Sequence, residues 1–372
     1  MTEKCVALLG RKDEPTDAVE EYCQYLGDAL RTHGFEMQLA RVPWAEKGWP
    51  VALRELTQKA IQWHGAWALV QYTALAWSER GFPLRFLGVL KALRPAGARI
   101  VVVYHDVEPY AGKRAVDKLR RHAQLRTMRE ALRLADLAVF TVPIEKLSWI
   151  RRPARNALFI PVGANLPSPE SAWVRKPLNS LRTPTIAIYG ITGGDAGVAE
   201  IEHITTAMEY LTQRVGKVRL LVFGRNSDSA GLGLRAKLQK IAVELEILGL
   251  LPADKVVERL RMSDVLLFVR GAISSRRGSA IAGIACGLPV VAMESPETAP
   301  PITEAGIVLL SARSSHKETG EALAHILTDT AYRDSLAERS RHAQQQHFSW
   351  QAIAAKYVET LREQSKCFAI KN

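Results

Sequence analysis

Short apolar runs of strand length alternate with longer amphipathic segments, and this pattern limits the fold more than any other feature of the sequence. In the first half, strand-like runs such as Val6–Leu9 and Arg99–Tyr104 stand between helical segments such as Asp17–His33. The second half restarts the alternation at Thr185–Tyr189. Strands that alternate with helices predict parallel βαβ units, so we expect an α/β protein. Further helices are expected at Ile144–Arg151, Glu200–Gln213 and Leu232–Glu244.

A proline-rich stretch interrupts the alternation near the middle of the chain. The length of 372 residues suggests roughly two domains, and proline-rich segments are typical of domain boundaries. The prolines in question are Pro167, Pro169, Pro177 and Pro184. We therefore expect a Rossmann-like domain at 1–165, a linker at 166–184, a second Rossmann-like domain at 185–346, and a C-terminal helix at 347–372 that crosses back to the first domain.

The chain is basic, with 50 Lys and Arg against 38 Asp and Glu and a formal net charge of +12. This balance favours anionic partners such as nucleotide diphosphates or acidic lipid surfaces. No nucleic-acid recognition motif accompanies it, so no nucleic-acid partner is expected. Four cysteines without metal-ligand spacing indicate a reducing compartment and no metal site. Because the sequence shows neither a signal peptide nor an apolar run of about 20 residues, we expect a cytoplasmic protein.

Much of the positive charge lies between Lys113 and Arg133, in a segment expected to be helical. Its basic residues are Lys113, Arg114, Lys118, Arg120, Arg121, Arg126, Arg129 and Arg133. A basic helix with aromatic neighbours can lie on an anionic membrane surface. A solvated helix face explains the same residues equally well. The first interpretation predicts peripheral association with the inner face of a membrane.

The segment from Gly271 to Ala292 carries the strongest functional signal. A predicted buried strand is followed by a polar loop with Arg276 and Arg277, and Gly278 and Ser279 then begin a short apolar helix. Free N–H groups at a helix start, the helix dipole and nearby guanidinium groups together favour an anion. We interpret this corner, with the hydroxyl of Ser274, as a diphosphate-binding site. Solvated loop arginines are the alternative.

Several motifs occur in an order and spacing that resemble one known family. They are Val101–Asp106, Phe159–Asn165, Leu220–Gly224, Leu248–Pro252, Ala285–Val291 and His347–Trp350. On these residues the chain resembles the retaining GT-B glycosyltransferases, the group 1 or family 4-like enzymes. The resemblance implies a GT-B fold, in which two Rossmann-like domains with parallel sheets face an interdomain cleft. It also implies sugar transfer from a UDP- or GDP-linked donor to a glycan or lipid-linked acceptor, without a metal or other cofactor.

The resemblance assigns further site residues. It places His105, as the catalytic residue, near the hydroxyl groups of the donor sugar; a surface cap at the end of the strand is the alternative. Acceptors approach the loop after the first strand, which here begins with Gly10 and Arg11; a plain basic loop is the alternative there. Glu294 and Glu297 follow a strand near the cleft and either could contact a sugar, although a glutamate in a proline-rich turn, as at position 297, more often faces solvent.

The chain also departs from the family pattern. The two family glutamates fall on Ser274 and Ala282, and the loop Gly190–Val198 lacks the Arg and Lys that hold the diphosphate. We expect Arg225, Arg276 and Arg277 to supply the missing charge. Gly190, Thr192 and Gly193 either contact the ligand or serve only the turn. The missing residues leave a second hypothesis open, that the chain is a catalytically silent binding or scaffold protein.

Overall fold

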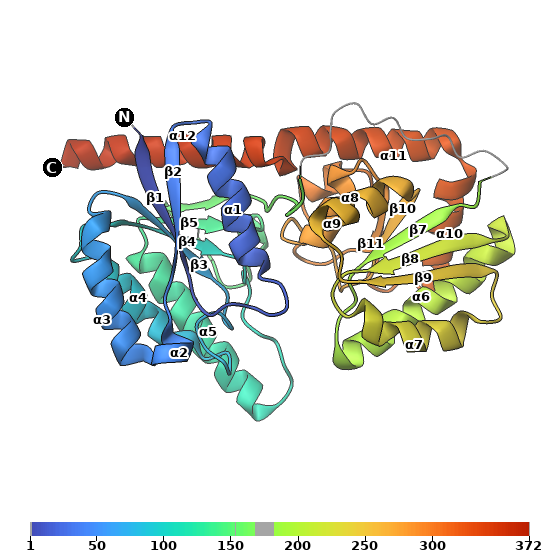
Figure 1. Cartoon of the computed structure of the whole chain (residues 1–372), viewed down its shortest axis with the longest axis horizontal. Helices are drawn as coiled ribbons and strands as arrows, with labels where there is room; N and C mark the ends of the chain where they lie inside the picture. The colour runs from blue at the N-terminus through green and yellow to red at the C-terminus, as the bar shows by residue number, and fades with distance from the viewer. Residues whose placement is uncertain (1, 153, 168–181, 372) are drawn as a thin grey trace. The chain divides into compact units, whose positions relative to one another are not determined.

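The computed structural model describes residues 2–152, 154–167 and 182–371, and the strands in this part of the chain form two six-stranded sheets (Figure 1). Every strand pair in both sheets is parallel, as the alternation predicts. The chain forms two compact units, one of Met1–Pro161 with Trp350–Asn372 and one of Val162–Ser349. We call these unit 1 and unit 2. Most of the linker expected at 166–184 lies outside the described residues.

Sheet A of unit 1 has the strand order β2-β1-β3-β4-β5-β6. Its strands are β1 (Glu3–Leu9), β2 (Phe35–Arg41), β3 (Trp67–Tyr72), β4 (Arg99–Tyr104), β5 (Leu137–Phe140) and β6 (Ala157–Phe159). The central strands β3, β4 and β5 are almost wholly buried. This burial explains their continuous Val, Ile, Leu and aromatic runs, because helices cover both faces of such a sheet.

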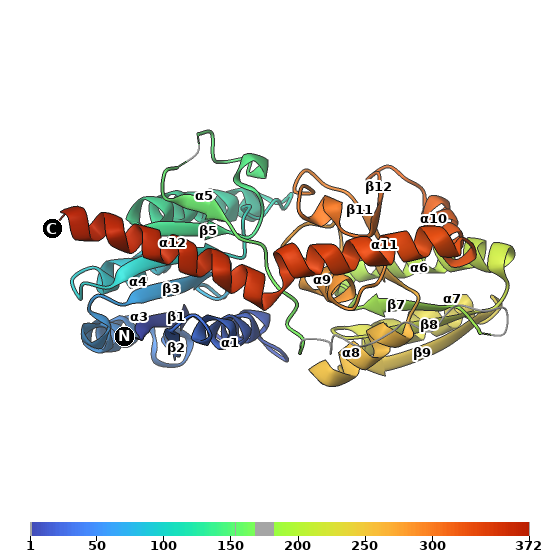
Figure 2. The same cartoon turned by 90° about the horizontal axis from the view of Figure 1, so that it is seen from above.

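The helices of unit 1 divide between the two faces of sheet A. They are α1 (Ala18–Arg31), α2 (Trp44–Lys47), α3 (Trp49–Ala60), α4 (Phe86–Leu93), α5 (Ala115–Leu134) and α12 (Trp350–Lys371). Helices α1 and α12 lie side by side over one face (Figure 2). The hydroxyl groups of Tyr22 and Tyr357 are 2.9 Å apart in this buried contact. The Asp17 side chain accepts hydrogen bonds from the N–H groups of Val19 and Glu20 and so caps α1.

Sheet B of unit 2 has the strand order β12-β11-β10-β7-β8-β9. Its strands are β7 (Thr185–Tyr189), β8 (Val218–Phe223), β9 (Val243–Gly249), β10 (Val265–Phe268), β11 (Val290–Met293) and β12 (Ile307–Leu310). Its helices are α6 (Gly194–Val215), α7 (Ser227–Leu238), α8 (Ala253–Met262), α9 (Gly278–Ala285), α10 (His316–Thr328) and α11 (Thr330–Ala343). Sheet and helices enclose a second core that includes Ile186, Leu220 and Leu267.

Three expected helices differ from the observed ones. The helix expected near Ile144–Arg151 is only one short turn, Ile144–Lys146, after which buried Leu147 and Trp149 tie the chain to the core. Helix α6 begins at Gly194, six residues before the expected start. Helix α7 ends at Leu238, and residues 243–244, expected in that helix, begin β9 instead.

Each sheet contains one point where the connections diverge. The first strand of sheet A, β1, pairs with β2 on one side and β3 on the other. The first strand of sheet B, β7, likewise pairs with β8 and β10. Ligands in open α/β sheets bind outside the carboxyl ends of the strands at such switch points. The β1/β3 edge and the β7/β10 edge are therefore the places to look for a site.

Candidate functional site

At the β7/β10 edge, Arg270 lies against the loop that follows β7. A Cβ atom added to Gly190 would be 3.1 Å from Cδ and 3.2 Å from Nη1 of Arg270. Gly190 also has a φ of 84°, which disfavours any side chain. Glycine at this position therefore lets the arginine side chain rest directly on the backbone of the loop.

The guanidinium group of Arg270 makes no hydrogen bond or ion pair with the residues that the structure describes. Burial lowers the pKa of Arg270; Arg225 lowers it further, while Glu200 and Tyr189 oppose the shift. Arginine stays charged at neutral pH, and a partly buried charge without a partner costs free energy. The β7/β10 edge is thus suited to an anion.

Arg270 was not among the residues expected from the sequence, although a signal was present. It is the first charged residue after the uninterrupted apolar run Val265–Val269. Arg225 holds a comparable place after β8, two residues beyond Phe223. A cation directly after a buried parallel strand lies at the ligand-binding edge of the sheet, which is the rule that would have found it.

The first N–H groups of the loop after β7 donate hydrogen bonds to neighbouring residues of the protein. Gly190 donates to the carbonyl of Phe223 at 2.7 Å, Ile191 to the carbonyl of Arg225 at 3.0 Å, and Thr192 to Oε2 of Glu200 at 2.7 Å. The N–H groups of Gly190 and Thr192 therefore serve the turn. Gly193 is exposed and precedes Gly194, the first residue of α6, so the free helix start is the part of this loop that can face a ligand.

The corner at the start of α9 has the helix that the sequence predicts, but its two arginines differ. Arg276 donates to both carboxylate oxygens of Glu297, from Nε at 2.8 Å and from Nη2 at 3.0 Å. Arg277 donates from Nε to the carbonyl of Ala272 at 3.2 Å. The space around Gly278 is open to 4 Å. The charge of Arg276 is therefore compensated by Glu297, while the open helix start remains suited to an anion.

Two serines of this corner also differ in their surroundings. Ser274 is fully buried and its hydroxyl donates to Oε2 of Glu297 at 3.2 Å. Ser279 is half-buried in the first turn of α9. Glu297 itself is only 17% exposed at its side chain, so the expectation that it faces solvent is wrong. Glu294, by contrast, is exposed.

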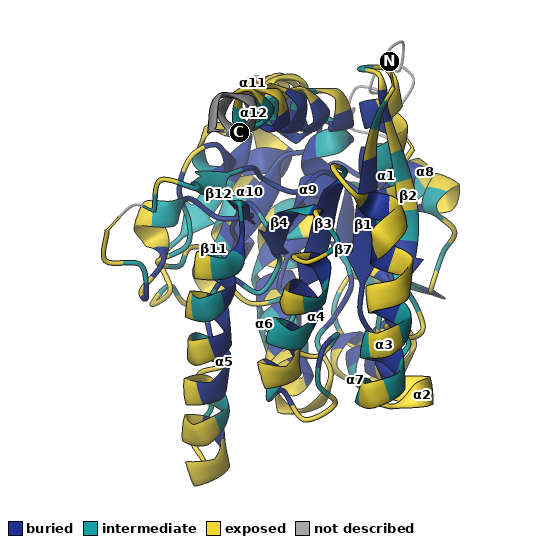
Figure 3. Cartoon of the chain, turned by 90° about the vertical axis from the view of Figure 1, so that its left-hand side faces the viewer, coloured by how far each residue is buried: buried dark blue, intermediate teal, exposed yellow. Residues whose placement is uncertain are grey.

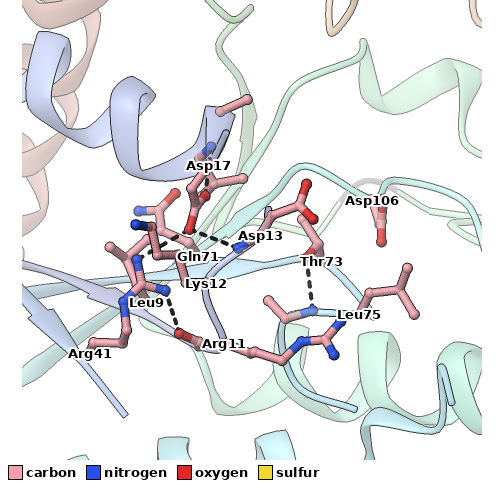
Figure 4. Close-up of a pocket in the computed structure, with 14 residues that line it drawn as sticks. Leu9, Arg11, Lys12, Asp13, Asp17, Arg41, Gln71, Thr73, Leu75 and Asp106 are labelled. Atoms are coloured by element: carbon pink, nitrogen blue, oxygen red, sulfur yellow. Dashed lines mark hydrogen bonds and ion pairs between the residues drawn. The ribbon is translucent and has the colours of Figure 1, made fainter. Parts of the chain in front are cut away.

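In unit 1 a pocket of about 250 Å³ lies at the β1/β3 edge (Figure 4). Its lining includes both residues expected on the acceptor side, Gly10 and Arg11. Three cations of the lining (Arg11, Lys12, Arg41) are matched by three carboxylates (Asp13, Asp17, Asp106). Arg41 donates from Nη1 to the carbonyl of Gly10 at 2.7 Å and from Nη2 to Asp17 at 3.1 Å. The pocket is therefore polar and close to charge balance.

His105 follows β4 and lies beside this pocket rather than in its lining. Its Nε2 is 2.8 Å from Oε1 of Gln71, whose Nε2 donates to the carbonyl of Leu69 at 3.1 Å. Because that second bond fixes the amide, His105 must donate from Nε2, which leaves Nδ1 as an acceptor. Burial lowers the pKa of His105 to about 4, although Asp17 opposes the shift. The ring is therefore neutral near pH 7.

Most of the cations of helix α5 are exposed, and exposed residues recur along the length of this helix (Figure 3). Val116 and Leu119, near the start of the helix, are 45% and 62% exposed among these cations. Arg120 is an exception, because it donates to Asp117 at 2.6 Å. The exposed face thus combines positive charge with apolar side chains. Within the described residues, no helix is both long and apolar enough to traverse a bilayer.

No group of three or more His, Cys, Asp or Glu in the part of the chain that the structure describes could hold a metal ion. Cys5, Cys23 and Cys286 are buried and form no disulfide with one another. Burial raises the pKa of Cys5 to about 12, and nearby Glu3 and Glu36 add to the effect, so this thiol is not a nucleophile at neutral pH.

No family model matches the sequence, and no curated protein matches it. Solved structures, however, match over nearly the whole chain. Sucrose-phosphate synthase from Thermosynechococcus elongatus is 16% identical with a TM-score of 0.68, and the match covers 98% of this chain and 100% of that one. HepE from Anabaena, solved with UDP and glucose, is 15% identical with a TM-score of 0.65, covering 97% and 100%.

A third match extends the comparison beyond transferases. A putative UDP-N-acetylglucosamine 2-epimerase from Listeria monocytogenes is 11% identical with a TM-score of 0.64, covering 98% of this chain and 97% of that one. At such identities the likeness establishes architecture and not activity. The two parallel sheets and these matches together define the chain as an α/β protein with the GT-B fold, as the sequence motifs predict.

Proposed function

We propose that this chain is a glycosyltransferase that moves a sugar from a UDP- or GDP-linked donor to an acceptor. The observation that carries the proposal is Arg270, a partly buried guanidinium without a partner among the described residues, at the switch point of sheet B. A diphosphate would compensate that charge with charge-assisted hydrogen bonds. HepE, solved with UDP and glucose, shares the fold and makes a nucleotide sugar the natural ligand to test.

In this proposal the departing diphosphate is stabilised by positive charge that is already in place. Arg270 and Arg225 act from the strand ends, and Arg277, Gly278 and Ser279 act at the start of α9. Fixed cations and a helix dipole can neutralise a developing diphosphate charge without a metal ion. Arg276, which we expected among these groups, has a different role because Glu297 holds it.

His105 would orient the donor sugar in its neutral form. With Nε2 donating to Gln71, the free Nδ1 can accept a hydrogen bond from a sugar hydroxyl. A neutral ring is favoured by the lowered pKa of about 4. The motif resemblance implies retention of the anomeric configuration, which proton NMR of the first product formed would test.

The pocket at the β1/β3 edge would hold the acceptor. Its balanced charges and several hydrogen-bonding side chains suit a neutral, hydroxyl-rich group better than a polyanion. Such a group is found in a glycan or in the sugar part of a lipid-linked acceptor. The exposed cations and apolar residues of α5 support a further part of the proposal, that unit 1 binds an anionic membrane surface from the cytoplasmic side.

Calorimetric titration with UDP and with GDP tests the proposal directly. Binding of one of them, followed by turnover of the matching nucleotide sugar, is the expected result. Binding of neither nucleotide would overturn the proposal of a UDP- or GDP-linked donor.

A catalytically silent GT-B protein is the second candidate function. It is favoured by the pairing of Arg276 with Glu297 and by the Thr192 N–H that already donates to Glu200. A silent protein that binds no anion, however, would have nothing to maintain the unpartnered Arg270 against its electrostatic cost, so a silent protein would still be expected to bind one. Nucleotide binding without any turnover of UDP-glucose, UDP-N-acetylglucosamine or GDP-mannose would favour this candidate.

A further inference from the structure

The segment after β11 holds Glu297 in a fixed position. The hydroxyl of Thr298 donates to the carbonyl of Ile273 at 2.6 Å, and the N–H of Glu297 donates to Oγ of Ser295 at 3.1 Å. The N–H of Ile273 donates in turn to the carbonyl of Met293 at 2.8 Å. These bonds join the turn after β11 to the loop after β10, so the backbone of Glu297 is fixed at the carboxyl edge of sheet B.

The carboxylate of Glu297 is oriented by two side chains of that neighbouring loop. Arg276 donates to Oε1 and Oε2, and Ser274 donates to Oε2 alone. Burial raises the pKa of Glu297, but the hydrogen bonds and charge of Arg276, with Arg277 and Ser274, lower it below its ordinary value. The group is therefore a carboxylate at neutral pH, and its plane is set by the guanidinium fork.

One acceptor position of this carboxylate remains unused by the described residues. Each carboxylate oxygen offers two lone pairs. Oε2 accepts two hydrogen bonds, but Oε1 accepts only the one from Arg276. A charged, pre-oriented acceptor with one open position suits a hydroxyl donor, because an O–H···O⁻ bond is roughly twice as strong as a neutral one.

We propose that Glu297 binds a hydroxyl group of the donor sugar, with Arg276 and Ser274 as its positioning residues. This inference rests on the proposed function. The chain has serine and alanine at positions 274 and 282, where its motifs lead one to expect carboxylates. The hydroxyl of Ser274 instead contacts Glu297, so a carboxylate reaches the vicinity of position 274 from the next β-strand connection.

The experiment compares nucleotide with nucleotide sugar. Dissociation constants for UDP and UDP-glucose, or for GDP and GDP-mannose if that pair binds better, are measured for the wild type, Glu297→Gln and Glu294→Gln. Glu294 is the matched control because it is exposed on the same turn. We expect Glu297→Gln to change nucleotide affinity less than twofold and to weaken the nucleotide sugar at least tenfold. Glu294→Gln should change neither.

A second measurement keeps the inference testable if Glu297→Gln disturbs the turn. The wild type is titrated with nucleotide sugars deoxygenated at one ring position at a time. One of these analogues should lose as much affinity as Glu297→Gln does, and the variant should lose nothing further with that analogue. Equal weakening of nucleotide and nucleotide sugar, or full affinity for every deoxy analogue, would overturn the inference. Absence of all nucleotide binding would instead overturn the proposed function.

Discussion

Each sheet has a switch point beside its first strand, but the two switch points differ in their electrostatics. At the β1/β3 edge of unit 1, Arg41 is held by Asp17, Glu20 and a backbone carbonyl. At the β7/β10 edge of unit 2, Arg270 lacks any such partner among the described residues. An arginine at the ligand-binding edge of a parallel sheet is therefore not in itself a sign of an anion site.

The difference lies in which atoms satisfy each guanidinium group. Arg41 donates a hydrogen bond to the loop that lines the pocket, so its role is to hold that loop. Arg270 donates no hydrogen bond to the described residues, and its side chain packs on Gly190. We infer that the first arginine mainly contributes stability and the second mainly contributes affinity.

The largest expected effect is on nucleotide affinity. Arg270→Ala should weaken UDP or GDP binding by about 2–3 kcal/mol, because charge-assisted hydrogen bonds to a diphosphate are lost. Isothermal calorimetry measures the change. Without nucleotide, the variant should unfold at no lower temperature than the wild type, since it loses an uncompensated charge. Arg235→Ala, on the exposed side of α7, is the control; an unchanged affinity in Arg270→Ala would remove this residue from the site.

Substitution of Arg41 in unit 1 should lower stability and leave nucleotide affinity unchanged, the reverse of what is expected for Arg270. Arg41→Ala leaves Asp17, which is 9% exposed, without its guanidinium partner. We expect a loss of about 2 kcal/mol in the free energy of unfolding, as for other broken, largely buried polar pairs. Urea denaturation measures it. Nucleotide affinity should stay within twofold, and a large loss of affinity at unchanged stability would reverse the roles of the two arginines.

Acid should destabilise unit 1 through His105. Its pKa of about 4 in the folded state lies below the ordinary 6.5, so the unfolded state binds the proton more readily. This contribution to stability is complete above pH 6.5 and is lost as the pH falls toward 4. One such group gives a loss of about 1–2 kcal/mol between pH 7 and pH 5. His105→Gln should show a correspondingly smaller loss in denaturation at the two pH values; an identical loss would mean that His105 titrates normally.

The smallest single-residue effects are expected on the outer face of α5, whose cations face solvent instead of an internal partner. Arg121→Gln and Arg126→Gln should each weaken binding to phosphatidylserine-containing vesicles by about 1 kcal/mol. Vesicle sedimentation measures this, and added salt should weaken the binding further. Arg235→Ala in unit 2 serves again as control. Equal binding to phosphatidylcholine vesicles would contradict the membrane interpretation.

The fold could be predicted because parallel strands buried on both faces leave unbroken apolar runs such as Arg99–Tyr104, which the sequence displays directly. Helix α7, whose observed bounds differ from the expected Leu232–Glu244, shows the limit of that reasoning. Gly231 and Gly233 lie inside the helix, where they weaken a helical pattern. Gly231 avoids a tight contact, because a Cβ atom at this position would be 3.3 Å from side-chain atoms of Ile247, and no local pattern reveals that contact.

The site was predicted less completely, for a related reason. The start of α9 at Gly278 follows from local residues and could be predicted. The pairing of Arg276 with Glu297 could not, because the partners are 21 residues apart and meet only when β10 and β11 are neighbours. The unpartnered state of Arg270 is a property of its whole surroundings, so sequence alone does not disclose it.

The partly buried charge of Arg270, which packs on Gly190, has a consequence for the stability of the protein in a cell. Empty, unit 2 carries the partly buried charge of Arg270, which Arg225 repels and Glu200 and Tyr189 attract; a bound anion would compensate that charge. Ligand supply would then govern how often unit 2 opens and how quickly proteases remove the chain.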